Sequence, residues 1–166
     1  MLYENVFRSL KAQKIQYVVV GGVAMVLHGH VRFTFDLDLI VALSPKNLTR
    51  FAKVMTKMGY RPRVPVDPED FADRALRESW RKEKHMKVFT YIHPNEPSFG
   101  QIDVFVYEPI PFKELYWDRV IVKEDGMEVS IVSLPHLLKL KKLAGREKDA
   151  GDIAALKKLM KAKQNR

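Results

Sequence analysis

The sequence predicts an α+β (mixed α/β) fold, in which helices flank a mixed β-sheet and a short helical segment closes the chain. Helix-like and strand-like apolar periodicities follow one another in an irregular order, which argues against a regular parallel repeat. Two pairs of predicted strands are joined by segments that carry Gly, Pro or Asp-Gly, as antiparallel hairpins are. The length of 166 residues suits one domain with a substantial core.

The first part of the chain alternates helices with strands. Apolar side chains recur with the spacing of a helix face in some segments and form short continuous or alternating runs in others. The elements expected there are, in order, a helix over residues 2–13, a strand over 16–20, a short helix over 23–28 that Gly29 ends, and a strand over 33–42.

The first residues of two further helices identify them. Ser44 is a typical N-cap, Pro45 a typical first helical residue, and Gly59 a typical residue at which such a helix ends. Residues 67–70 (Asp-Pro-Glu-Asp) begin the next helix with the same chemistry. Trp80 lies on the apolar side of that helix, and we expect it in the core.

The second half of the chain contains the two hairpins and the closing helices. We expect strands over 87–92 and 101–107, a second hairpin over 119–132 around Asp125-Gly126, and helices over about 134–144 and 147–162 that separate at Gly145. We expect residues 1–166 to form a single domain, with a catalytic core over about 1–112 and the second hairpin and C-terminal helices over about 113–166.

Composition narrows the function classes. The chain has no cysteine, which excludes disulfides and thiolate metal sites and favours a cytoplasmic setting. The longest apolar stretch, residues 17–27, is too short to span a bilayer, so we expect no membrane partner. The formal net charge of +9 favours a polyanionic partner such as a nucleotide or RNA, although a solvated basic surface explains it equally well.

Two carboxylates lie at alternate positions in the predicted strand over 33–42. Side chains alternate between the faces of a strand, so Asp36 and Asp38 should share one face with Thr34. The opposite face should be a wall of apolar side chains: Phe33, Phe35, Leu37, Leu39 and Val41. Asp is a poor strand former and like charges on one face repel, and a bound divalent cation is the simplest way to offset that cost.

Asp103 is the candidate for a third carboxylate. It interrupts the apolar pattern of the predicted strand over 101–107, as Asp36 and Asp38 do in theirs. If the two strands are neighbours, three carboxylates converge, and oxygen ligands of this kind suit Mg²⁺ or Mn²⁺. The alternative is that Asp103 lies on a solvated sheet face.

Gly21 and Gly22 stand between a predicted strand and a predicted helix. Glycine allows backbone N–H groups to approach a phosphate closely. A tight strand-to-helix turn would also explain the pair, which matches neither a P-loop nor a dinucleotide-binding fingerprint.

Together these residues resemble the nucleotidyltransferase superfamily with the DNA polymerase beta-like fold. The resemblance rests on Gly21-Gly22, on Arg32-x-Thr34-x-Asp36-Leu37-Asp38, and on a later strand aspartate. The form of the second motif is most similar to the AbiEii-type branch, which contains toxins of toxin–antitoxin and phage-defence systems. Near the C-terminus, a helical lysine followed by Arg-x-Lys-Asp-x-x-Asp resembles the closing motif of that branch; we assign it to Lys139, Arg146, Lys148, Asp149 and Asp152.

The resemblance implies a Mg²⁺- or Mn²⁺-dependent enzyme that moves a nucleoside monophosphate from a nucleoside triphosphate to an acceptor hydroxyl. The acceptor would be an RNA 3′ end such as that of tRNA, a protein or a small molecule, and the chain would act in a toxin–antitoxin pair. Asp36, Asp38 and Asp103 would be the catalytic and metal-binding residues. The residues implied to contact the nucleotide or its phosphates are Gly21, Gly22, Arg32, Thr34, Lys139, Arg146, Lys148 and Asp152.

One departure from the family pattern leaves a second hypothesis open. Val23 stands where many relatives have Ser or Thr after the glycines. The alternative is therefore a catalytically inactive protein of the same fold that acts as a basic RNA- or protein-binding module.

Overall fold

The computed structural model describes residues 3–95, 100–124 and 126–164. Its elements are, in chain order, α1 (Glu4–Ala12), β1 (Tyr17–Val20), α2 (Gly21–Leu27), β2 (Leu37–Val41), α3 (Pro45–Lys57), β3 (Arg61–Pro62), the 3₁₀ helix η1 (Pro68–Ala72), α4 (Arg74–Glu83), β4 (Val88–Ile92), β5 (Gln101–Phe105), α5 (Phe112–Trp117), β6 (Val120–Glu124), β7 (Met127–Ile131), α6 (Leu134–Ala144), the 3₁₀ helix η3 (Glu147–Asp149) and α7 (Ala150–Gln164).

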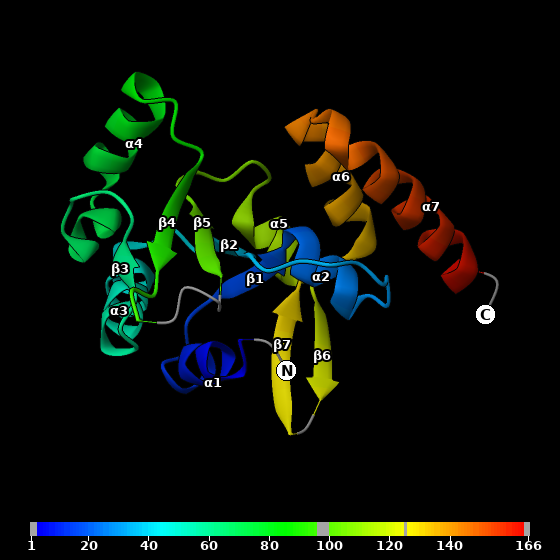
Figure 1. Ribbon diagram of the computed structural model, residues 1–166, viewed down its shortest axis with the longest axis horizontal. Coiled ribbons are helices and arrows are strands. Elements are labelled where there is room, and N and C mark those ends of the chain that lie inside the picture. The colour runs from blue at the N-terminus through cyan, green and yellow to red at the C-terminus, as the bar shows by residue number, and fades with distance from the viewer. Residues whose placement is uncertain (1–2, 96–99, 125, 165–166) are drawn as a thin grey trace.

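The strands of the described residues form one mixed sheet in the order β3-β4-β5-β2-β1-β7-β6. The central pair β1 and β2 is antiparallel, whereas β2 with β5 and β1 with β7 are parallel. In the view of Figure 1, α1 lies below β1 and to the left of β7, and α6 and α7 lie at the upper right, above β1 and β7. The expected α+β class, a mixed sheet flanked by helices with a helical C-terminal segment, is confirmed.

The core explains the strand patterns. Tyr17–Val20 is buried along its whole length because β1 is a central strand and α2 and α5 pack against it. β4 and β5 instead alternate buried with partly buried positions, as expected of strands with one covered face. Leu137 of α6 and Leu156 of α7 belong to the same hydrophobic core as the sheet.

Both expected hairpins are present. β4 pairs antiparallel with β5, and β6 pairs antiparallel with β7. The second turn includes Gly126, whose φ is +73°, in the left-handed region that favours glycine. Asp125, the other residue of the expected turn, lies outside the described residues.

The expected strand over 33–42 is wrong in its first part. β2 begins only at Leu37, because β1 ends at Val20 on one side and the pairing with β5 starts at Ile102 on the other. Residues 33–36 therefore have no strand partner in the described part of the chain. Phe33 and Phe35 are 79% and 52% exposed and contact each other edge to face, so they do not belong to the expected apolar wall.

The helix expected from residue 67 is two helices. Asp67 caps the 3₁₀ helix η1 by accepting a hydrogen bond from the Glu69 N–H, and Asp73 starts α4 by accepting one from the Leu76 N–H. In both caps an Asp side chain accepts a hydrogen bond from a backbone N–H of the first helical turn, and the first of the two was identified from the sequence. Trp80 is 6% exposed and stacks on Phe89, as expected of a core residue.

The remaining helices begin and end where their capping residues indicate. α3 starts with Pro45 and is followed by Gly59, and α6 ends at Gly145 in the left-handed conformation. Among the helices of the described residues, none has the length and apolarity needed to cross a membrane.

Candidate active site

Two carboxylates lie side by side on the central strands. In the parallel pairing of β2 with β5, Asp38 is directly opposite Asp103. Their strand neighbours Leu37, Leu39 and Ile102 are fully buried on the other face. Because side chains alternate along a strand, Asp38 and Asp103 emerge together on the face that is not filled by the core.

Hydrogen bonds hold the Asp103 carboxylate in one orientation. Its Oδ1 accepts a bond of 2.6 Å from the Thr90 hydroxyl of the neighbouring strand β4, and its Oδ2 accepts one of 3.1 Å from the Gln101 side-chain amide. A carboxylate oxygen can accept more than one hydrogen bond, so both oxygens keep capacity for a further ligand.

The surroundings of Asp38 disfavour the charged form of its carboxyl group. Burial, followed by the negative charges of Asp103 and Asp36, raises its pKa from 3.8 to about 6, while the positive charge of Lys141 acts in the opposite direction. A nearby cation would counter this effect by favouring the charged form of the carboxyl group.

Asp36 approaches this pair from outside the sheet. It lies in the extended segment before β2 and is exposed, and its charge contributes to the raised pKa of Asp38. The structure therefore brings the three predicted carboxylates into one neighbourhood, with two of them on paired strands and the third on a loop.

The glycine pair is packed against the carboxylate strand. Gly21 has a φ of +64°, and a Cβ atom there would lie 1.9 Å from Asp38 Oδ2. A Cβ atom on Gly22 would lie 2.4 Å from Thr34 Oγ1. Only glycine fits either position without displacing these side chains, so the backbone that begins α2 lies directly beside the carboxylates.

A cavity of about 350 Å³ opens over these residues, between the sheet and α6. This size is within the range of small-molecule binding sites. Its lining has an acidic side, a basic side and an apolar side, formed respectively by Asp38 and Asp103, by Lys87, Lys141 and Arg146, and by Phe105, Tyr107, Leu137 and Leu140.

Two acidic residues hold the cations around the cavity. Lys141 is 6% exposed and pairs with Asp149 at 2.9 Å and with Asp152 at 2.6 Å. Asp149 also pairs with Arg146 at 2.7 Å, and Asp152 also pairs with Arg32. The network ties the C-terminal helices to the loop that precedes β2.

The pKa values of this network reflect its pairing. Burial alone would raise the pKa of Asp149, but hydrogen bonds from Arg146 and Lys141 outweigh it and hold the pKa below its usual value. The same hydrogen bond raises the pKa of Arg146. The Asp149 carboxylate of η3 is therefore a charged partner that positions Lys141 and Arg146.

The structure separates the predicted basic residues into two groups. Arg146 lines the cavity and Arg32 reaches the network through Asp152. Lys139 and Lys148 are exposed and do not line it; Lys139 pairs instead with Glu114 at 3.7 Å.

Lys141 is the lysine that α6 contributes to the cavity, and the sequence reasoning assigned Lys139 to this role instead. Two residues of a helix place a side chain on nearly the opposite side, so Lys139 cannot share the face of Lys141. Leu134 and Leu137, three residues apart, define the buried stripe of α6. Lys141 follows Leu137 by four residues and therefore continues this stripe. That spacing is visible in the sequence and could have found the residue.

The donor set fits a hard divalent cation that arrives with a phosphate ligand. No group of three or more His, Asp or Glu side chains within residues 3–95, 100–124 and 126–164 is already arranged around a metal position. Mg²⁺, however, is usually bound through one or two carboxylates together with substrate phosphates and water. Asp38 and Asp103 supply two such carboxylates, side by side on paired strands.

Known structures share this fold. The chain is similar to TM1012 of Thermotoga maritima, assigned as a nucleotidyltransferase (TM-score 0.57, 15% identity, 98% of this chain and 90% of that one). It is similar to the lincosamide antibiotic adenylyltransferase LnuA with bound lincomycin (TM-score 0.61, 15% identity, 93% and 94%). It is also similar to ANT(2")-Ia in complex with adenylyl-2"-tobramycin (TM-score 0.62, 11% identity, 98% and 90%).

These likenesses confirm the resemblance to the nucleotidyltransferase superfamily at the level of the fold. They extend over almost the whole chain, including the C-terminal helices. No protein-family model and no curated protein sequence matches the chain.

Proposed function

We propose that this protein is a nucleotidyltransferase that moves a nucleoside monophosphate from a nucleoside triphosphate to an acceptor hydroxyl, with Mg²⁺ or Mn²⁺ as cofactor. The observation that carries the proposal is the pairing of Asp38 with Asp103 on adjacent parallel strands, beside glycine backbone and opposite Lys141. Acidic and basic groups face each other across one cavity there, as a metal-bound triphosphate requires.

The acidic side would hold the metal and the acceptor. Asp38 and Asp103, with Asp36 from the loop, would be the metal ligands, and the ion when bound would neutralise phosphate charge. Asp103, fixed by Thr90 and Gln101, would also take the proton of the acceptor hydroxyl. The acceptor oxygen forms a bond to the α-phosphorus, the bond from that phosphorus to the β-phosphate oxygen breaks, and pyrophosphate leaves.

The glycine backbone and the basic side would hold the triphosphate. Gly21 and Gly22 leave room for phosphate oxygens to reach backbone N–H groups. Lys141 and Arg146 would bind the leaving pyrophosphate, and their carboxylate partners keep the side chains in place when no nucleotide is bound. Most of the rate enhancement would come from positioning and charge neutralisation, as in other phosphoryl transfers.

The nature of the acceptor is the open part of the proposal. LnuA and ANT(2")-Ia are described with lincomycin and adenylyl-tobramycin, so a hydroxylated small molecule is one candidate. RNA 3′ ends, tRNA included, and proteins are the others, and the AbiEii-like motif leads us to propose a toxin that a partner antitoxin neutralises.

Label transfer tests the activity. The protein is incubated with Mg²⁺ and each α-³²P-labelled nucleoside triphosphate, and with total RNA, a cell lysate, lincomycin or tobramycin as acceptor. We expect labelled acceptor and released pyrophosphate from the wild type, and at least about a hundredfold less from Asp38→Asn and Asp103→Asn. Glu83→Gln, which removes an exposed carboxylate of α4, is the matched control and should keep full activity.

The alternative, an inactive binding module of the same fold, predicts a different result. Val23 is buried in α2 and offers no hydroxyl to a phosphate, which is the observation that favours this alternative. For an active site of the kind proposed, Mg²⁺ with ATP raises the melting temperature of the wild type but not of Asp38→Asn. If neither label transfer nor this rise is observed, the protein is not a nucleotidyltransferase.

A further inference from the structure

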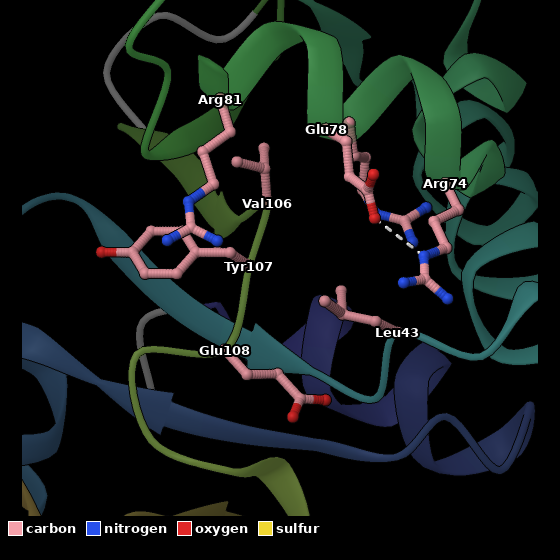
Figure 2. A pocket seen from close by; sticks show the side chains of 8 residues that line it. Leu43, Arg74, Glu78, Arg81, Val106, Tyr107 and Glu108 are labelled. Carbon is pink, nitrogen blue, oxygen red and sulfur yellow. Dashed lines mark hydrogen bonds and ion pairs between the residues drawn. The ribbon is translucent and has the colours of Figure 1, made fainter.

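A second cavity, of about 440 Å³, lies at the far end of the sheet strands from the carboxylates. Its walls are the face of α4 that carries Arg74, Arg77 and Arg81, and the segment after β5 that carries Val106, Tyr107 and Glu108 (Figure 2). Tyr107 is four residues beyond Asp103, which corresponds to about 13 Å of extended chain. Tyr107 lines both cavities, but the arginines line only this one.

Arg77 is a buried cation without a carboxylate partner. Its side chain is 5% exposed, and Nη1 donates a hydrogen bond of 2.7 Å to the carbonyl oxygen of Phe71, a neutral acceptor. Within the described ranges it makes no ion pair. A guanidinium has five N–H groups, and burying its charge is costly unless an anion compensates it.

Arg81 is a second cation at the same cavity, and unlike Arg77 it is exposed. It follows Arg77 by four residues and therefore lies on the same face of α4. Figure 2 shows its guanidinium over the ring of Tyr107, at 4.5 Å from the ring centroid. It, too, has no ion pair with the described residues.

The carboxylates of the cavity make no direct ion pair with these two guanidinium groups, although the charges of Asp73 and Glu78 act on Arg77 from nearby. Glu78 is bound to Arg74 at 2.8 Å, as the dashed line in Figure 2 marks. Glu108 accepts a hydrogen bond of 3.2 Å from the Phe112 N–H at the start of α5, and in Figure 2 it lies on the side of the cavity opposite Arg81. Arg77 and Arg81 thus place two guanidinium groups at one cavity that are free of ion pairs with the described residues.

We propose that the cavity under α4 binds a phosphate group, separately from the triphosphate site. A phosphate monoester carries a charge of about −1.5 to −2 at neutral pH, which matches the two free guanidinium groups, whereas a carboxylate would neutralise only one. A guanidinium group can also bind two oxygens of one phosphate at once, through two parallel N–H···O hydrogen bonds. Leu43 and Val106 add an apolar wall, so the ligand is a phosphorylated organic molecule.

Fluorescence titration with inorganic phosphate tests the site directly. Trp80 immediately precedes Arg81, so its fluorescence reports on α4. All proteins in the titration carry Trp117→Phe, which removes the fluorescence of the exposed Trp117. We expect a saturable change, and about tenfold weaker binding in Arg81→Gln. Lys82→Gln removes the same charge from an exposed position that does not line the cavity, and should bind phosphate within about twofold of the parent protein.

Competition experiments and a second variant identify the ligand and the cavity that binds it. Ribose 5-phosphate should compete with inorganic phosphate, whereas ribose and acetate should not. Equal binding by Arg81→Gln and Lys82→Gln, or equal competition by acetate, would overturn the proposal. So would phosphate binding that is lost in Lys141→Met but kept in Arg81→Gln, because the phosphate would then occupy the triphosphate site. None of these outcomes depends on whether the protein transfers nucleotides.

Discussion

Asp38→Asn should stabilise the folded protein at neutral pH while it removes a carboxylate of the candidate site. Burial, followed by the charges of Asp103 and Asp36, raises the pKa of Asp38 to about 6. The native state therefore binds this proton more tightly than the unfolded chain does. The stabilisation from this group is complete below about pH 4 and is lost as the pH rises through 6.

The size of the effect follows from the pKa. A rise from 3.8 to about 6 corresponds to about 3 kcal/mol of unfolding free energy once the group is ionised in both states. Solvent reaches part of the Asp38 side chain and screens its charge. We therefore expect Asn, which keeps the shape without the charge, to raise the unfolding free energy by about 1 to 3 kcal/mol at pH 8 and by almost nothing at pH 4.

Urea denaturation between pH 4 and pH 8 measures the difference. Groups other than Asp38 titrate in both proteins, so the gap between the two curves isolates this carboxyl. Glu83→Gln, at an exposed position, should leave the pH dependence unchanged. Mg²⁺ with ATP should stabilise only the wild type and so narrow the gap. A gap that does not widen between pH 4 and pH 8 would refute the electrostatic reasoning.

Three further changes test the site and its supports. In urea denaturation, Gly21→Ala should lower the unfolding free energy by about 1 to 3 kcal/mol more than Gly126→Ala does. Both glycines have positive φ, but only Gly21 lies against a carboxylate. Equal losses would contradict the close approach of Gly21 to Asp38. Lys141→Met should cost about 1.5 to 3 kcal/mol, because Asp149 and Asp152 each lose a hydrogen-bonded cation and keep only Arg146 and Arg32, respectively, whereas the exposed Lys142→Met should change stability by less than about 0.5 kcal/mol. Asp73→Ala should lower the melting temperature through a loss of about 1 kcal/mol, and no loss would mean that its cap on α4 is not formed in solution.

The sequence predicted the order of elements well, because local chemistry decides them. Glycines at positive φ, a Pro at a first helical position and Asp caps each act within a few residues. The strand over 33–42 failed for the opposite reason. Its length depends on where β1 and β5 end, so alternation alone could not show that Phe33 and Phe35 would stay outside the sheet.

In the candidate site, too, local sequence pattern predicted some residues, and contacts between distant segments determined others. The sequence marked Asp38 and Asp103 because a carboxylate inside an apolar strand is conspicuous, and the sheet places them opposite each other. It could not show that Asp152 binds Arg32, because that contact joins residues 120 positions apart in the chain. The arginines of α4 were missed because their cavity forms only when the segment after β5 packs beside α4, a contact between segments distant in the sequence.

The arrangement of charge around the main cavity explains how it can hold both a cation and a triphosphate. The cavity has carboxylates on the sheet and cations on the helical side, and groups so close could simply pair with each other. Asp149 and Asp152 prevent this, because they hold Lys141 and Arg146 on the helical side at 2.6 to 2.9 Å. Burial and the charge of Asp103 keep the pKa of Asp38 raised, although Lys141 acts in the opposite direction from across the cavity. The helices thus contribute their own counter-charges, and the sheet carboxylates stay available for a metal.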